Sequence, residues 1–279
     1  MPQSPEHYEN FPVASVLCPP RLRPAVVALY QFARTADDLA DEGDATAAQR
    51  LEALGRYRSQ LLLASQHPVS AGSEWAAVFV PLRAVLMQYG LSCGLLLDLL
   101  DAFVQDVEMT ALNVGYHDEA HLLDYCRRSA NPVGRLLLHL YDVDSAQAFA
   151  HSDAICTALQ LINFWQDCSV DLSRGRCYFP ETWMHQHGTD AATVRSGAAP
   201  GAEQALVAHC VQHARRLMAS GAPLVHLVPG RAGWELRLVV QGGLRVLEKV
   251  ERLGAQALQQ RPRLYAHDYL VMLWRALRM

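Results

Sequence analysis

Two acidic clusters have a spacing that suits metal binding. The stretch "RTADDLADEGD" holds Asp37 and Asp41 four residues apart, and the stretch "NFWQDCSVD" places Asn163, Asp167 and Asp171 at successive intervals of four. On an α-helix, residues four apart lie on the same face, each about 6 Å beyond the last. Each stretch would therefore present a ladder of oxygen atoms along one side of a helix.

The segments that precede both clusters are strongly apolar. They read "AVVALYQFA" and "ALQLINFW", so the carboxylates end helices that are otherwise suited to burial. One such pair alone is typical of a solvated surface, but two pairs beside buried helices need a charge partner. Mg²⁺ prefers hard oxygen ligands and shares its shell with substrate phosphates. Arg34 and Arg176 suit bidentate phosphate recognition, and Arg174 is a third nearby cation.

These parts predict an ionisation reaction. Magnesium held by the paired aspartates would clamp a diphosphate and make it a leaving group, which leaves a carbocation. A cavity for a carbocation needs apolar walls and aromatic faces. The aromatic candidates each fit ordinary core packing as well, and they are Tyr30, Phe32, Tyr125, Phe164, Trp165 and Tyr178.

The elements that must position these residues are helices. Apolar residues recur at spacings of three and four, and alternating strand patterns are scarce, which predicts an all-α protein. With 279 residues and 51% hydrophobic content, the chain can bury a large core, and we expect one domain over 1–279. The helices are expected at 22–40, 47–66, 74–90, 94–112, 118–142, 145–172, 201–220, 233–260 and 264–277. The stretch "HQHGTDAATVRSGAAPG" is expected to be a loop.

Composition excludes several classes of protein. A net charge of −4 argues against a nucleic-acid partner. The seven cysteines contain no C-x-x-C pair, which argues against a disulfide framework or zinc knuckle and favours the cytoplasm. The sequence shows neither an export signal nor a membrane span. The C-terminal stretch "RPRLYAHDYLVMLWRALRM" fits either a helix on a membrane surface, giving peripheral attachment, or a helix packed on the bundle.

Three ordered motifs resemble the squalene and phytoene synthases, the head-to-head prenyl synthase family. They are "YQFARTADDLAD", "YCRRSANPVG" and "LQLINFWQDCSVDLSRGRCYFP". The resemblance implies a helical isoprenoid-synthase bundle with a central apolar pocket. It implies that the magnesium ligands or their close supports are Asp37, Asp41, Asn163, Asp167 and Asp171. The residues implied to contact the prenyl diphosphate or its cation are Tyr30, Arg34, Gln160, Arg176, Tyr178, Tyr125 and Phe11.

The details within the family lean towards an enzyme that converts presqualene diphosphate and water to hydroxysqualene. Carotenoid-type members usually have Arg where this chain has Gln166, and polar or basic residues where this chain has Glu9 and Asn10. A site that is commonly Tyr aligns with Gly243. These departures weaken the case for holding two separate diphosphates. The resemblance implies that an upstream presqualene diphosphate synthase supplies the substrate, and that no nicotinamide is needed.

Several alternatives remain open at the level of sequence. One is head-to-head condensation of two prenyl diphosphates to squalene, dehydrosqualene or phytoene, and another is a non-catalytic relative with a scaffold role. A di-metal oxidase would want E-x-x-H pairs, and the sequence has none. Asp106 stands where the family tends to have an acidic residue, and it also fits an ordinary position on a helix surface. We expect His117 and His121 to have a surface or capping role.

Overall fold

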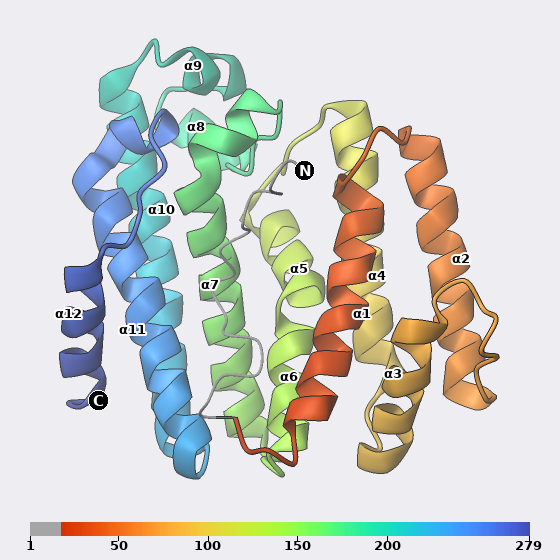
Figure 1. The fold of residues 1–279 in the computed structure, drawn as a ribbon. Helices are drawn as coiled ribbons and strands as arrows, with labels where there is room; N and C mark the ends of the chain where they lie inside the picture. Colours follow the sequence, from red (N-terminus) through yellow and green to blue (C-terminus); the bar gives the residue numbers. More distant parts are fainter. Residues whose placement is uncertain (1–17) are drawn as a thin grey trace.

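The computed structural model describes residues 18–279, and in these residues the chain is helical without strands (Figure 1). The all-α prediction is confirmed. In chain order the helices, with two short 3₁₀ helices written η, are α1 (Arg23–Asp41), α2 (Ala47–Gln66), α3 (Ala76–Tyr89), α4 (Cys93–Leu112), α5 (Glu119–Ser129), α6 (Asn131–Leu140), α7 (Ala146–Ser173), α8 (Glu181–Gln186), α9 (Ala191–Ser196), α10 (Pro200–Gly221), η1 (Ala222–His226), α11 (Gly230–Leu253), η2 (Gly254–Leu258) and α12 (Ala266–Ala276).

Local signals set where the helices begin and end. Thr46 and Gln49 form a capping box at the start of α2, which satisfies backbone N–H groups that have no partner inside the helix. The Ser145 hydroxyl accepts a hydrogen bond from the Ala148 N–H at the start of α7. Gly90 takes the left-handed conformation that ends α3 (φ +62°).

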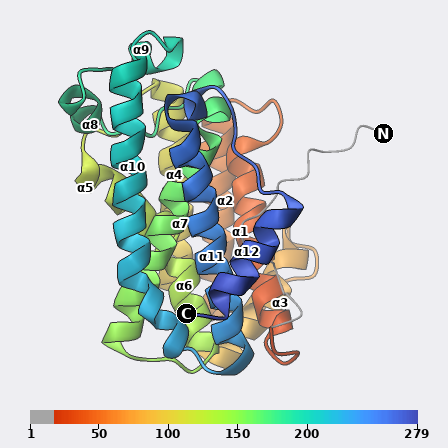
Figure 2. The ribbon, with the colours of Figure 1, turned by 90° about the vertical axis from the view of Figure 1, so that its left-hand side faces the viewer.

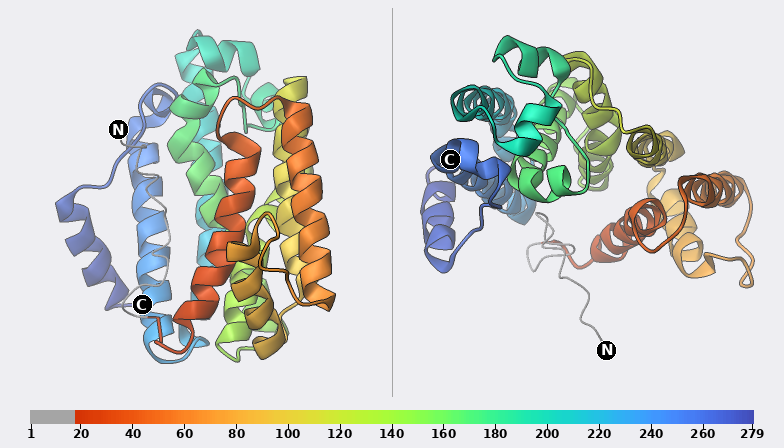
Figure 3. Two further views of the ribbon diagram at one scale, coloured as in Figure 1. Left: turned by 45° about the vertical axis from the view of Figure 1, so that its right-hand side comes forward. Right: turned by 90° about the horizontal axis from the view of Figure 1, so that it is seen from above.

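The long helix α7 is the centre of the bundle. It packs against α5, α6, α10 and α11, while α1 to α4 form a second group beside it (Figures 1 and 3). Each group has its own buried core. Trp165 of α7 stacks on Phe179, with ring centroids 5.1 Å apart. Phe32 of α1 stacks on Tyr57 at 5.2 Å. Because both rings are fully enclosed in these cores, Phe32 and Trp165 serve core packing rather than a reaction cavity.

Three expected elements differ from the structure. The single helix predicted over 118–142 is wrong, because Ala130 leaves helical geometry (φ −121°) and Pro132 starts a new helix, α6. The predicted loop contains α9, whose first turn is capped by the Asp190 side chain. The helix predicted over 233–260 ends at Leu253, where Gly254 has a positive φ of 55° and η2 follows.

A buried ion cluster attaches α12 to α11. The Asp268 carboxylate is fully enclosed and lies 2.7 Å from Arg245 and 2.7 Å from Lys249. It also accepts a hydrogen bond from the Tyr265 N–H at 2.6 Å. Burial alone would raise the pKa of Asp268, but the hydrogen bonds from Lys249, Tyr265 and Arg245 outweigh it and hold the pKa well below its ordinary value.

We predict that Asp268→Asn lowers the free energy of unfolding by about 3–5 kcal/mol near pH 7, because it leaves buried cations without a counter-charge. Since the pKa is lower in the folded chain, the advantage of the wild type is complete above the unfolded pKa of about 4 and is lost as pH falls below it. Urea unfolding at pH 7 and pH 3 measures both effects. Glu251→Gln, which removes an exposed ion pair with Arg215, is the control and should cost under about 1 kcal/mol. Equal losses in the two variants would contradict the prediction.

Candidate functional site

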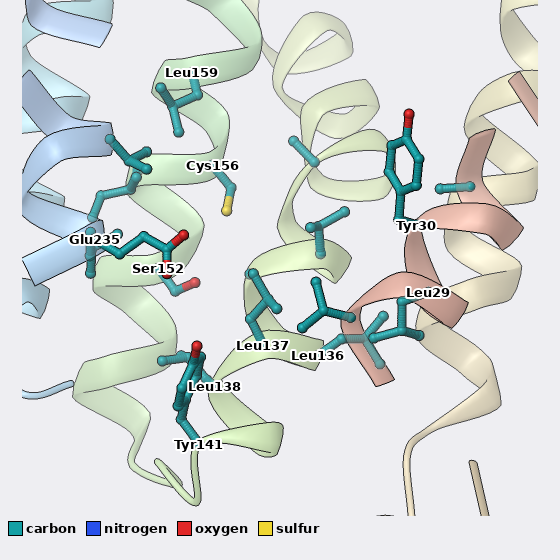
Figure 4. Close-up of a pocket in the computed structure, with 18 of the residues that line it drawn as sticks. Leu29, Tyr30, Leu136, Leu137, Leu138, Tyr141, Ser152, Cys156, Leu159 and Glu235 are labelled. Atoms are coloured by element: carbon teal, nitrogen blue, oxygen red, sulfur yellow. The ribbon is translucent and has the colours of Figure 1, made fainter. Parts of the chain in front are cut away.

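Two adjoining cavities run through the bundle. The first has a volume of about 410 Å³ and apolar walls from α1, α6, α7 and α11 (Figure 4). The second has a volume of about 490 Å³ and contains acidic and basic groups. Leu99, Ser129 and Gln160 line both cavities, so the two spaces meet at these residues. An apolar space that adjoins a charged one suits a ligand with a hydrocarbon part and an anionic part.

The apolar cavity is bounded along one side by a stripe of α7. Ser152, Cys156, Gln160 and Asn163 follow one another at intervals of four, four and three, so they share one face of the helix. Figure 4 shows Tyr30 across the space on α1. The predicted contacts Tyr30, Gln160 and Asn163 therefore lie in one cavity. Most of the remaining lining is leucine, valine and alanine from α1, α6 and α11.

The polar cavity holds the first aspartate motif. Asp37 and Asp41 line it from α1, and Arg176 lines it from the segment that follows α7. Arg176 donates a short hydrogen bond to Asp41, and Arg174 lies 3.6 Å from the same carboxylate. Burial alone would raise the pKa of Asp41, but the bonds to Arg176 and the charge of Arg174 hold the pKa below its ordinary value. Asp41 is therefore a paired anion in this structure.

Asp106 faces the same cavity from α4. The Tyr125 hydroxyl donates a hydrogen bond of 2.6 Å to its Oδ2. Poor solvation raises the pKa of Asp106 to about 7, and the negative charges of Asp37 and Asp41 add to the rise, while Tyr125 and Arg176 oppose it. The interpretation of Asp106 as a helix-surface residue is wrong. An acid inside the apolar run "AFVQDV" was the sequence signal for a buried role.

An aromatic wall borders the polar cavity. Tyr178 and Phe164 stack with ring centroids 3.8 Å apart, and Phe164 lies 5.9 Å from Tyr125. All three line the cavity. Behind them Tyr116, which the sequence analysis did not select, packs 5.7 Å from Tyr125 and 6.2 Å from Tyr178. Stacked ring faces next to an apolar space can stabilise a passing positive charge.

Asn163 of the second motif lines the apolar cavity, whereas Asp167 and Asp171 line neither cavity. Asp167 forms an ion pair with Arg261, which comes from the segment between η2 and α12. Asp171 is half-buried, and burial together with the charge of Asp167 raises its pKa to about 6. The charge of Asp41 contributes to the same rise. The two motifs are therefore electrostatic neighbours across the gap between α1 and α7.

Within residues 18–279 no three acidic, histidine or cysteine side chains converge as a preformed metal centre. The acids are held by arginines instead. On α1, Arg34 lies 3.3 Å from Asp37, 2.7 Å from Asp38 and 2.6 Å from Glu42. The donors are hard oxygens, and burial, followed by the charge of Asp167, raises the pKa of Asp171 although Arg176 and Arg174 oppose the rise. This chemistry fits Mg²⁺.

Two predicted contacts are not placed in the cavities. Arg34 pairs with acids of its own helix and lines neither cavity. Phe11 lies outside the described residues. The ligand set and the substrate contacts taken from the family resemblance stay predictions.

Two of the departures from the family pattern have a packing role. Gln166 is buried and its Nε2 donates to the Pro262 carbonyl at 3.1 Å, so it attaches the C-terminal segment to α7. Gln166 lines neither cavity, and its meaning for the number of diphosphates bound stays a prediction. A Cβ at Gly243 would lie 2.9 Å from the Leu159 Cδ2 and 3.0 Å from the Met218 Cε, so α11 approaches its neighbours closely there.

The paired histidines have the expected minor roles. The His117 Nδ1 lies 3.3 Å from a Glu181 carboxylate oxygen at the exposed surface. The His121 N–H donates to Asp118, which caps the first turn of α5.

The sequence profile of the squalene/phytoene synthases matches residues 4–268. The chain belongs to the squalene/phytoene synthase family. It is 42% identical to hydroxysqualene synthase of Zymomonas mobilis over 186 residues, which is 66% of this chain and 58% of that protein. It is 36% identical to hydroxysqualene synthase of Sinorhizobium fredii over 199 residues, or 71% and 63% of the two chains. The matched parts therefore span about three fifths of these curated relatives.

A solved structure of similar fold supports the same family. Squalene synthase HpnC from Alicyclobacillus acidocaldarius superposes with a TM-score of 0.79 at 35% identity, covering 89% of this chain and 90% of that one. The resemblance inferred from three motifs is confirmed by the family match, and so is the helical fold that it implied.

We predict that Asp106→Asn raises the free energy of unfolding at pH 8. The pKa of Asp106 is higher in the folded chain than in the unfolded chain, so ionisation of its carboxyl destabilises the fold as pH rises from about 4 to 7. The gain in the variant should be greatest above pH 7 and shrink towards pH 4. Urea unfolding of the wild type and the variant, with a chelator present, measures the difference in free energy of unfolding at pH 8 and at pH 4.

The matched control for this measurement is Glu108→Gln, an exposed acid on the same helix. It should change the free energy of unfolding by less than about 0.5 kcal/mol at either pH. A stabilisation by Asp106→Asn that is the same at pH 8 and pH 4 would show that its charge is not the cause.

Proposed function

We propose that this chain catalyses the magnesium-dependent conversion of presqualene diphosphate and water to hydroxysqualene and diphosphate. The observation that carries the proposal is the junction at Gln160, where the apolar cavity adjoins the cavity lined by Asp37, Asp41 and Arg176. A prenyl diphosphate has this division into hydrocarbon and anion. The curated relatives named hydroxysqualene synthase support the choice of reaction.

The diphosphate would bind among the groups of the polar cavity and its rim. We propose that Asp37, Asp41, Asn163, Asp167 and Asp171 hold magnesium, which when bound offsets the charge of the leaving diphosphate. Arg176 and Arg174 now lie against Asp41, close to where the diphosphate would sit. A bound diphosphate would compete with Asp41 for both guanidinium groups, which present paired donors to phosphate oxygens.

The hydrocarbon would fill the apolar cavity and keep bulk water away from the cation. Tyr178, Phe164 and Tyr125 present the aromatic wall of the polar cavity, where positive charge would develop as the diphosphate leaves. Water then adds its oxygen to the cation and releases a proton in the polar cavity. Asp106 offers a carboxylate there.

The second candidate function is head-to-head condensation of two prenyl diphosphates. The structure of similar fold from Alicyclobacillus acidocaldarius is named a squalene synthase, which favours this candidate. It would require room for two hydrocarbon chains and two diphosphates. We propose presqualene diphosphate because that substrate carries its two joined halves on a single diphosphate.

The substrate proposal has consequences for partners and location. An enzyme that joins two farnesyl units would supply presqualene diphosphate, and we propose that it acts upstream of this chain in the cytoplasm. We propose no nicotinamide cofactor, because capture by water needs no reductant. Among residues 18–279 no helix is both long and apolar enough to cross a bilayer. Peripheral contact with a membrane is compatible with that finding.

The direct test is incubation of the purified chain with Mg²⁺ and either presqualene diphosphate or farnesyl diphosphate, without nicotinamide. The proposal predicts hydroxysqualene from the first substrate and no consumption of the second, measured by chromatography and mass spectrometry. Oxygen from ¹⁸O-labelled water should appear in the alcohol. Consumption of farnesyl diphosphate to a C30 hydrocarbon or to presqualene diphosphate would establish the condensing function instead.

We predict that Asp37→Asn and Asp171→Asn each lower kcat/KM on the order of 100-fold or more, because each removes a charged oxygen ligand from the diphosphate site. The control is Asp153→Asn. Asp153 lies on α7 like Asp171, but it lines neither cavity and its carboxylate is 2.6 Å from the Arg135 guanidinium. It should keep kcat/KM within about threefold. Normal activity in both site variants, with circular dichroism unchanged, would remove these acids from the mechanism.

A further inference from the structure

The helix α12 turns its large apolar side chains outward. Tyr269, Leu270, Leu273, Trp274 and Leu277 lie one helical turn apart in two adjacent rows, so they share one face. Leu270 is 70% exposed, Trp274 53% and Leu277 61%. Figure 2 shows α12 at the outside of the bundle, against α11. Leu273 is 51% exposed, so Leu270, Leu273, Trp274 and Leu277 are all open to solvent to half or more of their surface.

The opposite face of α12 is the one that attaches it to the bundle. Asp268 and Ala276 on that side are fully buried, and Asp268 is paired with Arg245 and Lys249 of α11. An amphipathic helix on a protein surface normally buries its apolar face. Here ion pairs hold the helix in place and the larger apolar side chains remain available to a partner.

The apolar face continues onto α11. Trp234 is 44% exposed, and the Arg237 guanidinium lies 4.6 Å from its ring centroid. Arg237 also donates to the Met279 carbonyl at 2.6 Å, which places Trp234 beside the end of α12. We define the α12 face as Trp234, Tyr269, Leu270, Leu273, Trp274 and Leu277. A group of exposed large apolar side chains of this kind marks an interaction site.

The charge around the α12 face is positive. Asp268 is the only acid among residues 259–279, and it is buried and paired. Arg263 and Arg278 are exposed, and the Arg278 guanidinium lies 3.8 Å from the Trp274 ring centroid. The chain as a whole carries a net charge of −4. The C-terminal segment therefore carries positive charge, whereas the chain as a whole is negative.

We infer that the α12 face docks on the surface of a bilayer that contains anionic lipids. The tryptophan, tyrosine and leucine side chains would enter the boundary between headgroups and acyl chains, and Arg263 and Arg278 would contact lipid phosphates. A symmetric pair of chains joined through this face would bring the arginines of both copies together without acids between them. Charge complementarity therefore favours the anionic bilayer over a second copy.

The α12 face lies near the apolar cavity, so docking would bring the membrane close to the space that would hold hydrocarbon. On α11, Trp234 lies on the α12 face, while Glu235, Leu236 and Val239 line the cavity. Figure 4 shows Glu235 at that cavity. One helix thus separates the docked membrane from the space that would hold hydrocarbon. This last step rests on the proposed function, because it takes the hydrocarbon to be the substrate or product.

The experiment is vesicle flotation of the full chain, which does not depend on catalysis. Vesicles of phosphatidylcholine alone are compared with vesicles that contain phosphatidylglycerol. Docking predicts co-flotation with the anionic vesicles, weakened at high salt, and a blue shift of tryptophan emission that Trp274→Phe reduces. Leu270→Ser/Leu277→Ser and, separately, Arg263→Gln/Arg278→Gln should each weaken binding about tenfold or more.

The control variant is Leu63→Ser/Met87→Ser, which changes exposed apolar residues on α2 and α3 and should bind as the wild type does. Circular dichroism and thermal unfolding check that every variant is folded. Absence of flotation of the wild type, or undiminished flotation of both α12-face variants, would overturn the inference. So would a dimer in analytical ultracentrifugation that Leu270→Ser/Leu277→Ser dissociates while flotation is unchanged. A chain that floats but makes no hydroxysqualene would refute the proposed function and leave membrane docking intact.

Discussion

The ion pair between Asp41 and Arg176 joins the two halves of the bundle in the lining of the polar cavity. Asp41 ends α1 and belongs to the group of α1 to α4, whereas Arg176 follows α7 and belongs to the other group. Carboxylates from both groups meet here at the end of an apolar space, so their repulsion must be balanced by cations. In the structure these cations are arginines. A magnesium diphosphate would take over that balance, and the gathered carboxylates would then favour its binding.

The helix α7 couples this charged end to the apolar cavity. Its residues Ser152, Cys156, Gln160 and Asn163 run along the cavity, and Asp167 and Asp171 continue beyond it. A rigid helix fixes the distance between the place where hydrocarbon packs and the place where charge gathers. The rings of Trp165 and Phe179, stacked on the far side of α7, hold that helix against the core. Stability and the placement of reactive groups therefore depend on one element.

The parts that local pattern determines were predictable from the sequence. The ladder from Asn163 to Asp171 and the helices around both aspartate motifs follow from spacing, and the structure confirms these helices. Pro132 was a visible reason for α5 and α6 to separate, and the expected single helix over 118–142 passed over it. The direction in which a side chain points depends on tertiary packing instead. That is why Phe32 was a candidate for the aromatic lining although it is buried in the core. It is also why the sequence did not show that Gln166 binds the Pro262 carbonyl.

Asp106 and α12 are two further features whose tertiary surroundings the sequence left open. The sequence left Asp106 undecided because nothing local says that Tyr125 of another helix donates to it. For α12 the pattern showed an amphipathic helix and left its orientation open. The orientation is set by the ion cluster at Asp268, whose partners Arg245 and Lys249 lie about twenty residues earlier, on α11.

The central claim is that the acids of α1 and α7 close around a metal-bound diphosphate at the junction of the two cavities. The most direct measurement is a crystal structure with Mn²⁺ and inorganic pyrophosphate, in which anomalous scattering locates the metal. The account predicts manganese between Asp37 and Asp41 on one side and Asp167 and Asp171 on the other, with Arg176 moved from Asp41 to the pyrophosphate. Pyrophosphate bound by arginines alone, with no manganese at these carboxylates, would contradict it.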